Sequence, residues 1–344
     1  MARDWKRLDE DDVRVRPGRG SRPRTRRRPV HADAAAGFVT SVDRGRYRCL
    51  VADRAVTAMR ARELGRKGVV VGDRVRLVGD VSGRPDTLAR VVQVEPRTSV
   101  LRRTADDTDP VERVLVANAE QLVIVTALAD PEPRPRMIDR CLVAAFDAGL
   151  DPLLCLTKAD LASPETLVAA YEPLGVPYVV TRRGGRGAAI KTDDLLDRLT
   201  GRISVLVGHS GVGKSTLVNA LVPAAERAVR QVNPVTGRGR HTSSSAVALE
   251  LPTDGWIIDT PGVRSFGLAH VRPATLLAAF PDLEEGAADC PRACSHLQPD
   301  CALDAWVAAG HADPARLDSL RRLLTAREAT DSDLVLGPAT ETGD

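Results

Sequence analysis

Aromatic residues are scarce in this sequence: four Phe, three Trp and three Tyr make up 3% of its 344 residues. The cores of the protein must therefore be built mainly from Val, Leu, Ala and Ile. Long apolar runs are also missing, and no stretch approaches the roughly 20 apolar residues that cross a bilayer. No charged-then-apolar signal segment is apparent at the amino terminus. We therefore expect a cytoplasmic protein that has no membrane contact.

Cysteine is limited to six residues, which in a cytoplasmic protein are expected to be reduced thiols or metal ligands rather than disulfides. Twelve residues contain a compact cluster of possible ligands: Cys290, Cys294, His296 and Cys301. Three thiolates and one imidazole make a closed tetrahedral set, which is typical of structural zinc. We expect one structural Zn²⁺ ion. The other three thiols are expected to be buried apolar groups, at Cys49, Cys141 and Cys155.

Acidic residues are absent from residues 14–28, a stretch with eight arginines, although the net charge of the whole chain is only +3. Residues 1–35 have almost no apolar periodicity, so we expect a disordered arm whose charge screens polyanion phosphates. The opposite end lacks basic residues, and residues 331–344 are expected to form a disordered acidic tail.

Residues 36–103 have apolar residues near period two, interrupted by glycines, which predicts about five short strands. Such a segment is typical of a small β-barrel of the OB-fold type. Stacking aromatics are nearly absent from it, so RNA contact here would depend on charge. The candidate cations are Arg44, Arg46, Arg48, Arg60, Arg62, Arg66 and Lys67. A polar linker is expected at residues 104–117.

Residues 118–268 alternate between continuous apolar runs and helix-like stretches, which predicts an α/β domain with a buried parallel sheet. Residues 269–330 are expected to be mostly helical around the Cys/His cluster. The sequence therefore predicts a multidomain α/β protein, in which a nucleotide domain lies between a barrel and a helical zinc-binding domain.

A phosphate-binding loop follows the strand-like run "ISVLV" and precedes a helix-like stretch. Its glycines allow backbone N–H groups to surround a phosphate, and the helix N-terminus adds positive charge. Lys214 is expected to reach the β- and γ-phosphates, and Ser215 to ligate Mg²⁺. The nucleotide-contacting residues of the loop are Gly208, His209, Ser210, Gly211, Val212, Gly213, Lys214, Ser215 and Thr216.

The stretch "TKAD" at the end of another buried strand indicates which base is bound. A carboxylate at Asp160 can accept two hydrogen bonds from guanine, which adenine cannot donate. The stem of Lys158 would cover the face of the base. Thr157 stands where many GTPases have Asn. We expect the base site to comprise Thr157, Lys158, Ala159 and Asp160.

The segment "WIIDTPG" matches the metal-side strand of a GTPase, with Asp259 near Mg²⁺ and the Gly262 N–H near the γ-phosphate. The next residue, Val263, cannot orient water as the glutamine of Ras-like enzymes does. We expect His241 to orient the attacking water, although it could instead be an RNA-contacting loop residue. Thr242 or a neighbouring serine could complete the Mg²⁺ shell, and the sequence leaves this choice open.

The base motif precedes the phosphate loop here, which is the reverse of the usual order. In this order and combination, "PRTSVLRR", "ANAEQ", "TKAD", "GHSGVGKST", "GRGRHTSSS" and "DTPGVRSFGL" resemble the ribosome small subunit-dependent GTPase A family (RsgA, or YjeQ), which is a circularly permuted GTPase family. The resemblance implies a GTPase that binds the 30S subunit and its 16S rRNA, is stimulated by it, and assists its late maturation. We expect a monomer that exchanges GTP and GDP.

Two other interpretations remain open at this point. A P-loop ATPase or kinase would show no preference for GTP, which makes Asp160 the discriminating residue. A GTP-switched RNA-binding module that does not hydrolyse GTP would be compatible with Val263, and His241 discriminates it from an enzyme.

Overall fold

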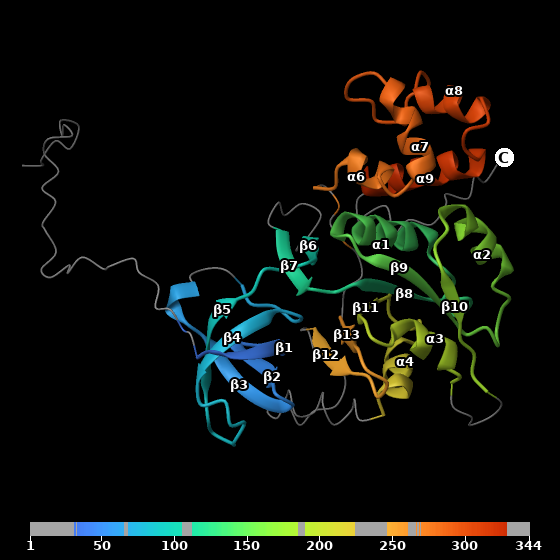
Figure 1. Ribbon diagram of the computed structural model, residues 1–344. Helices are drawn as coiled ribbons and strands as arrows, with labels where there is room; N and C mark the ends of the chain where they lie inside the picture. The colour runs from blue at the N-terminus through green and yellow to red at the C-terminus, as the bar shows by residue number, and fades with distance from the viewer. Residues whose placement is uncertain are drawn as a thin grey trace, which may run out of the picture. The chain divides into compact units, whose positions relative to one another are not determined.

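The computed structural model describes residues 31, 33–64, 68–104, 112–184, 190–223, 246–260, 266, 268 and 270–328. Apart from residues 1–32, these form one compact unit. Figure 1 traces the order of its parts from a barrel through an α/β layer to a helical segment. None of the helices in the described ranges has both the length and the apolar composition needed to cross a membrane.

The first part is a closed five-stranded barrel, as predicted. Each strand pairs with two neighbours in the cyclic order β1-β2-β3-β5-β4-β1, in which only β3 and β5 run parallel. The alternating apolar residues point inward, where Val39, Cys49 and Val91 are almost fully buried. Closure pairs every strand and removes exposed sheet edges. The strands are β1 (Ala35–Asp43), β2 (Arg46–Val51), β3 (Arg54–Arg60), β4 (Arg74–Gly79) and β5 (Ala89–Val94), with the 3₁₀ helix η3 (Arg62–Leu64).

A two-stranded hairpin joins the barrel to the next domain. It pairs β6 (Val100–Thr104) with β7 (Glu112–Ala117), so part of the expected linker is a strand. Asn118 donates from Nδ2 to the Gly72 carbonyl at 2.9 Å and accepts from the Thr98 N–H at 2.9 Å. Gly72 has φ +89°, and a Cβ there would lie 2.0 Å from the Ala117 carbonyl oxygen. The "PRTS" stretch (residues 96–99) and the "ANA" stretch (residues 117–119) therefore form the joint between the barrel and the α/β domain.

The α/β domain contains a sheet in the order β10-β9-β8-β11-β13-β12, in which only β12 is antiparallel. A single β1–β12 pair, Ser41 with Val247, joins this sheet to the barrel. The continuous apolar runs occur because both faces are covered, α1 and α2 lying on one face and α3 and α4 on the other (Figure 1). The elements are β8 (Gln121–Ala127), α1 (Pro135–Ala148), β9 (Asp151–Thr157), α2 (Glu165–Tyr171), η4 (Glu172–Leu174), β10 (Tyr178–Val180), α3 (Asp193–Leu199), β11 (Ile203–Val207), α4 (Lys214–Leu221), β12 (Val247–Glu250) and β13 (Trp256–Asp259).

The last part is helical, as predicted, and its long helix α9 packs against α1. Leu320 and Leu323 on α9 are fully buried in the core cluster that also covers one face of the sheet. The three thiols outside the Cys/His cluster are 0–1% exposed, which confirms their prediction as buried apolar groups. The helices are α6 (Pro273–Leu277), α7 (Pro281–Glu284), η5 (Gly286–Asp289), α8 (Ala302–Ala308) and α9 (Pro314–Glu328).

Candidate nucleotide site and metal centre

The predicted nucleotide motifs meet at one edge of the α/β sheet. The phosphate loop follows β11, the "TKAD" motif ends β9, and Asp259 ends β13. All three strands are parallel, so their carboxyl ends lie at the same edge, where open α/β sheets bind ligands. The reversed order of the motifs along the chain therefore does not separate them in space.

The phosphate loop has the backbone that its glycines predict. Gly211 and Gly213 have φ +86° and +95°, which favour glycine, and Gly213 is the N-cap of α4. A Cβ on Gly208 would lie 2.5 Å from the Val125 carbonyl oxygen, so this position needs glycine because of the neighbouring strand. The N-terminus of α4 thus opens onto the loop, as a phosphate site requires.

The loop lysine forms an ion pair with the acidic residue of the metal-side strand. Lys214 Nζ lies 2.5 Å from Asp259 Oδ1 and donates to the Thr260 carbonyl at 3.2 Å. The Thr260 hydroxyl in turn donates to the Leu206 carbonyl at 2.8 Å, which holds the end of β13 against β11. One cation and one carboxylate therefore lie together beside the N-terminus of α4.

The base motif is held directly against the phosphate loop. The buried Thr157 hydroxyl donates to the Val212 carbonyl at 2.6 Å and lies 3.3 Å from the Thr126 carbonyl oxygen. This contact joins β9 to the loop after β11, across 55 positions of sequence. Thr157, which differs from the usual Asn, therefore makes a hydrogen bond that fixes the loop relative to the base motif.

Asp160 and Lys158 are oriented by residues that the sequence analysis did not single out. The Arg183 N–H donates to Asp160 Oδ1 at 3.2 Å, and Lys158 Nζ donates to the Asp130 carbonyl. The Ala159 N–H donates to the Thr181 carbonyl at 3.2 Å. Asp160 is exposed, so its carboxylate is accessible to a ligand.

A cavity of about 370 Å³ lies between the base motif and the phosphate loop. Its lining includes six predicted residues, which are Thr157, Lys158, Asp160, Gly211, Gly213 and Thr216. It also includes four residues outside the predicted motifs, which are Asp130, Thr181, Arg182 and Arg183. The last four residues follow β8 and β10, whose carboxyl ends lie at the same edge of the sheet. That position was a signal available in the sequence, because polar residues after parallel strands tend to face the ligand.

His209 in the phosphate loop is half-buried. Burial lowers its pKa, and the nearby charges of Arg134 and Lys158 lower the pKa further, so the ring is neutral near pH 7. Nδ1 lies 2.8 Å from the Ser210 carbonyl oxygen, and within the described ranges the buried Nε2 has no hydrogen-bond partner. The His209 ring is therefore neutral and does not add a second positive charge to the phosphate loop beside Lys214.

Three predicted residues of the catalytic and magnesium sites lie outside the described residues: His241, Thr242 and Gly262. Val263 lies outside them as well, and so do Arg66 and Lys67 of the barrel. Their assignments stay predictions.

The four residues of the Cys/His cluster converge in the helical domain, where all their ligand atoms lie within 4.8 Å of one another. Cys290 Sγ lies 3.8 Å from Cys301 Sγ, and each of these sulfurs lies 3.6 Å from His296 Nδ1. A tetrahedral ion with metal–sulfur bonds of about 2.3 Å and a metal–nitrogen bond of about 2.0 Å predicts a sulfur–sulfur edge of about 3.8 Å and a sulfur–nitrogen edge of about 3.5 Å. The distances among Cys290, His296 and Cys301 therefore fit three ligands of a tetrahedral metal ion, and Cys294 Sγ lies within 4.8 Å of the other ligand atoms.

The surroundings of the cluster suit thiolate and imidazole ligands. The backbone N–H of His296 points to Cys294 Sγ at 3.4 Å, and Arg321 Nε donates to the backbone carbonyl of His296 at 3.0 Å. Burial lowers the pKa of His296, and the charge of Arg321 lowers the pKa further. Neutral imidazole is the form that binds a metal. The cluster can hold a metal ion.

Comparisons with known proteins agree with this geometry. A family model described as RsgA GTPase matches residues 94–269. A protein of Gemmatimonas aurantiaca named small ribosomal subunit biogenesis GTPase RsgA is 37% identical over 261 residues, which cover 74% of this chain and 83% of that protein. An Azotobacter vinelandii protein of the same name is 39% identical over 267 residues, which cover 75% of each chain.

Two solved structures share the fold. The crystal structure of YjeQ from Thermotoga maritima matches with a TM-score of 0.61 and 24% identity, over 86% of this chain and 99% of that one. The structure of YloQ, described as a circularly permuted GTPase, matches with a TM-score of 0.61 and 22% identity, over 86% and 95% of the two chains.

Proposed function

Because the chain belongs to the RsgA GTPase family, we propose that it hydrolyses GTP to GDP and phosphate on the 30S ribosomal subunit during late maturation of that subunit. The observation that carries this proposal is the 2.6 Å hydrogen bond from Thr157 to Val212, which makes the base motif and the phosphate loop one site. A P-loop ATPase or kinase has no need of the guanine-type motif that this bond holds in place.

Guanine selection depends on Asp160 in this proposal. Its carboxylate accepts the N1–H and the exocyclic amine of guanine, while the backbone N–H of Arg183 keeps the side chain in position. The stem of Lys158 covers one face of the base, because its ammonium is held at the Asp130 carbonyl. Adenine lacks the paired donors, so binding ATP would leave the carboxylate unpaired.

On nucleotide binding, Lys214 would exchange its ion pair with Asp259 for the β- and γ-phosphates. Ser215, Asp259 and either Thr242 or a neighbouring serine would hold Mg²⁺. The ion, when bound, neutralises charge that develops on the phosphate oxygens. The Gly262 N–H binds the γ-phosphate.

Water activation cannot use the side chain after Gly262, because the Val263 side chain has no polar atom. We assign this role to His241, whose imidazole can accept a hydrogen bond from the attacking water. The 30S subunit would stimulate hydrolysis by acting on His241.

The Cys/His cluster holds one structural Zn²⁺, since three thiolates and one imidazole leave no open coordination position for catalysis. The ion links the segment between η5 and α8 into one unit. That segment has few large apolar residues, so a metal compensates for a small core.

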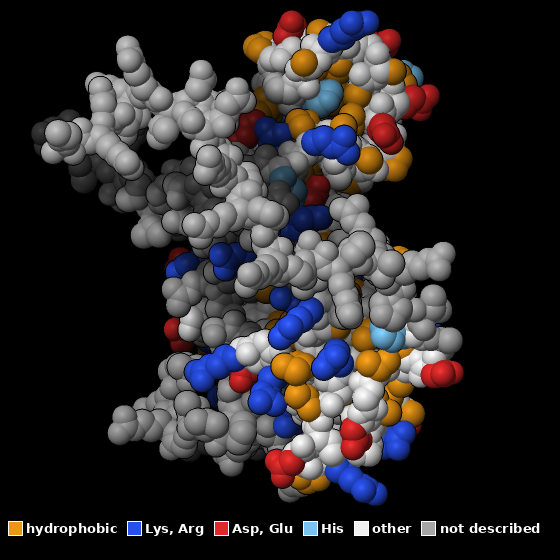
Figure 2. Space-filling model, turned by 90° about the vertical axis from the view of Figure 1, so that its left-hand side faces the viewer, with side chains coloured by type: hydrophobic (Ala, Val, Ile, Leu, Met, Phe, Trp, Pro, Cys, Tyr) orange, Lys and Arg blue, Asp and Glu red, His pale blue; other side chains and the backbone are white. Residues whose placement is uncertain are grey.

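The barrel supplies an electrostatic surface for 16S rRNA. Lys and Arg side chains gather on the face of the molecule that carries the barrel (Figure 2). Four of the predicted arginines of the barrel are exposed: Arg44, Arg46, Arg60 and Arg62. Binding through such a surface depends on phosphate neutralisation and therefore on salt. We infer a cytoplasmic monomer that contacts RNA in this way.

The nucleotide domain and the helical domain are joined by a buried arginine. Arg140 on α1 is 2% exposed, and it donates to the Phe266 carbonyl at 2.6 Å and to the Ala326 carbonyl at 3.3 Å. Phe266 follows the metal-side strand, whereas Ala326 is on α9. Asp139 and Arg322 form a second link between α1 and α9, with Arg322 Nε 3.1 Å from Asp139 Oδ1. These contacts support transmission of the nucleotide state to the helical domain.

The test is GTP hydrolysis with and without purified 30S subunits, using ATP as a competitor. We expect stimulation by 30S that ATP does not inhibit, and its loss in His241→Ala with GDP affinity retained. Tight GTP binding with no stimulated hydrolysis would instead identify a GTP-switched RNA-binding module.

A further inference from the structure

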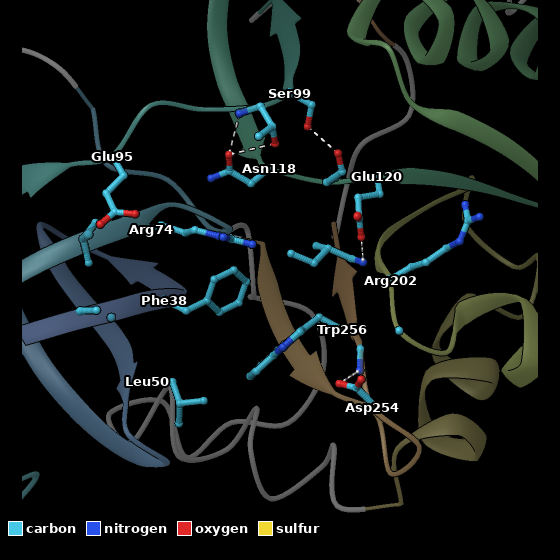
Figure 3. A pocket seen from close by; sticks show the side chains of 18 of the residues that line it. Phe38, Leu50, Arg74, Glu95, Ser99, Asn118, Glu120, Arg202, Asp254 and Trp256 are labelled. Atoms are coloured by element: carbon cyan, nitrogen blue, oxygen red, sulfur yellow. Dashed lines mark hydrogen bonds between the residues drawn. The ribbon is translucent and has the colours of Figure 1, made fainter.

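A second, larger cavity of about 950 Å³ lies at the edge of the sheet opposite the nucleotide site. The barrel forms one wall, and the amino ends of the α/β strands form the other. Figure 3 shows side chains from both walls pointing toward the same space. Its lining includes Phe38 and Arg74 from the barrel, Ser99 and Asn118 from the joint, and Trp256 from β13.

Two aromatic rings meet at this cavity in a chain that has ten aromatic residues in all. Phe38 on β1 and Trp256 at the start of β13 have ring centroids 4.9 Å apart and ring planes inclined by 48°. Both side chains are only partly buried, so ring surface remains accessible from the cavity. Such a surface is suited to stacking with a planar ring.

One arginine on the described walls has no ion-pair partner, whereas the other two pair with Glu95 and Asp151. Each acidic side chain there already accepts a hydrogen bond: Glu95 from Arg76, Asp151 from Arg202, Glu120 from the Ile203 N–H, and Asp254 from the Gly255 N–H. Among the residues that the structure describes, the Arg74 side chain has no such partner, and it is exposed. Arg74 lies opposite Phe38 in the β1–β4 register, so both side chains leave the barrel on the same face.

The remaining polar groups of the joint are engaged elsewhere. Asn118 uses its amide on the Gly72 carbonyl and the Thr98 N–H, and Ser99 Oγ donates to the Ala119 carbonyl at 2.5 Å. The cavity therefore offers a stacking surface and a guanidinium, but few free groups for reading the edge of a base. This combination is typical of nucleotide binding without base preference.

We propose that this cavity binds one unpaired nucleotide of RNA, with its base against Trp256 and Phe38 and its phosphate at Arg74. The chemistry rests on the cavity alone, whereas RNA as the source of the nucleotide rests on the proposed function. Barrels of this topology commonly bind oligonucleotides, and the surrounding arginines attract a polyanion. A free mononucleotide has the same chemistry and is the alternative source.

The test uses fluorescein-labelled pentauridylate as the probe, with the phosphate loop saturated with GDP. Anisotropy gives the affinity, and Trp emission reports stacking at the cavity. Arg74→Ala and Trp256→Phe are compared with Arg90→Ala, which removes an exposed arginine of the same barrel outside the cavity. Phe keeps a ring against Phe38, so the contact between β13 and the barrel is retained.

We expect the probe to quench Trp emission saturably in the wild-type protein and not in Trp256→Phe. The emission of this variant also gives the signal that the other two tryptophans contribute. Arg74→Ala should weaken the probe about tenfold or more, and Arg90→Ala at most about threefold. Equal effects of the two arginine variants, or quenching that persists in Trp256→Phe, would overturn the site. Quenching by AMP with none by pentauridylate would retain a nucleotide site and overturn RNA as its source.

The same preparations are assayed for 30S-stimulated GTP hydrolysis. A wild-type protein that 30S does not stimulate would refute the proposed function, whatever the fluorescence shows. A stimulated wild-type protein without a probe-dependent signal would refute the cavity proposal alone.

Discussion

Replacing Thr157 with Val tests whether the base motif holds the phosphate loop in its binding geometry. Val has nearly the shape of Thr but lacks the hydroxyl that donates to the Val212 carbonyl at 2.6 Å. Thr157 is 4% exposed, so water cannot readily replace the lost donor. Leaving a buried carbonyl unpaired costs about 1–3 kcal/mol. If this cost appears in nucleotide binding, the Kd for GDP should rise by about 5- to 150-fold.

The assay is equilibrium binding of a fluorescent GDP analogue, together with urea unfolding. Ser204→Ala is the matched control, because it removes a buried hydroxyl that is 3.0 Å from Gln121 Oε1 at the opposite end of the same sheet. It should lower the free energy of unfolding without changing GDP affinity. Thr157→Asn supplies the residue common in other GTPases, whose amide can donate to the same carbonyl, so GDP affinity should recover to within about threefold.

A Thr157→Val protein whose GDP affinity stays within about twofold of wild type would refute the reasoning. It would mean that the loop glycines and α4 hold the loop without help from β9. An equal loss of affinity in Ser204→Ala would also refute it, since the effect would then reflect general loosening of the sheet.

Four other changes test separate parts of the molecule. Asp160→Ala should weaken GTP about tenfold or more and leave ATP unchanged, in competition against labelled GDP. Cys301→Ser should remove bound zinc, measured by metal analysis, and lower the melting temperature; unchanged zinc would contradict the site. Arg140→Lys cannot reach both of its carbonyl acceptors, so the free energy of unfolding should fall by about 1–3 kcal/mol, and 30S stimulation should fall more than basal hydrolysis. The hydrogen bond from Arg316 lowers the pKa of Asp282. This pair therefore stabilises the fold at pH values above the ordinary Asp pKa of about 3.9, and the stabilisation is lost as the pH falls through the lowered pKa. Arg316→Gln should remove this part of the acid sensitivity, measured by urea unfolding at a series of pH values.

Local patterns in the sequence were sufficient for most of the fold. Alternation of period two predicted the barrel strands, and continuous apolar runs predicted β8, β9 and β11. These patterns are readable because each depends on which neighbours along the chain face a core. The phosphate loop and Asp160 were identifiable for the same reason, since a short motif and its flanking elements carry the signal. The density of Cys and His between residues 290 and 301 likewise predicted the metal centre.

Contacts between distant segments could not be obtained in this way. The parallel pairing of β3 with β5, the bond from Thr157 to Val212, and the contacts of Arg140 join residues that lie far apart in the sequence. Asp130 and Thr181 follow recognisable strands, but their approach to Asp160 depends on the order of strands in the sheet. Sheet order and domain contacts result from packing summed over many side chains, so no local stretch encodes them. The sequence by itself therefore determined which residue types make up the candidate nucleotide and metal sites, and the tertiary structure decided which residues hold those sites together and where the second cavity lies.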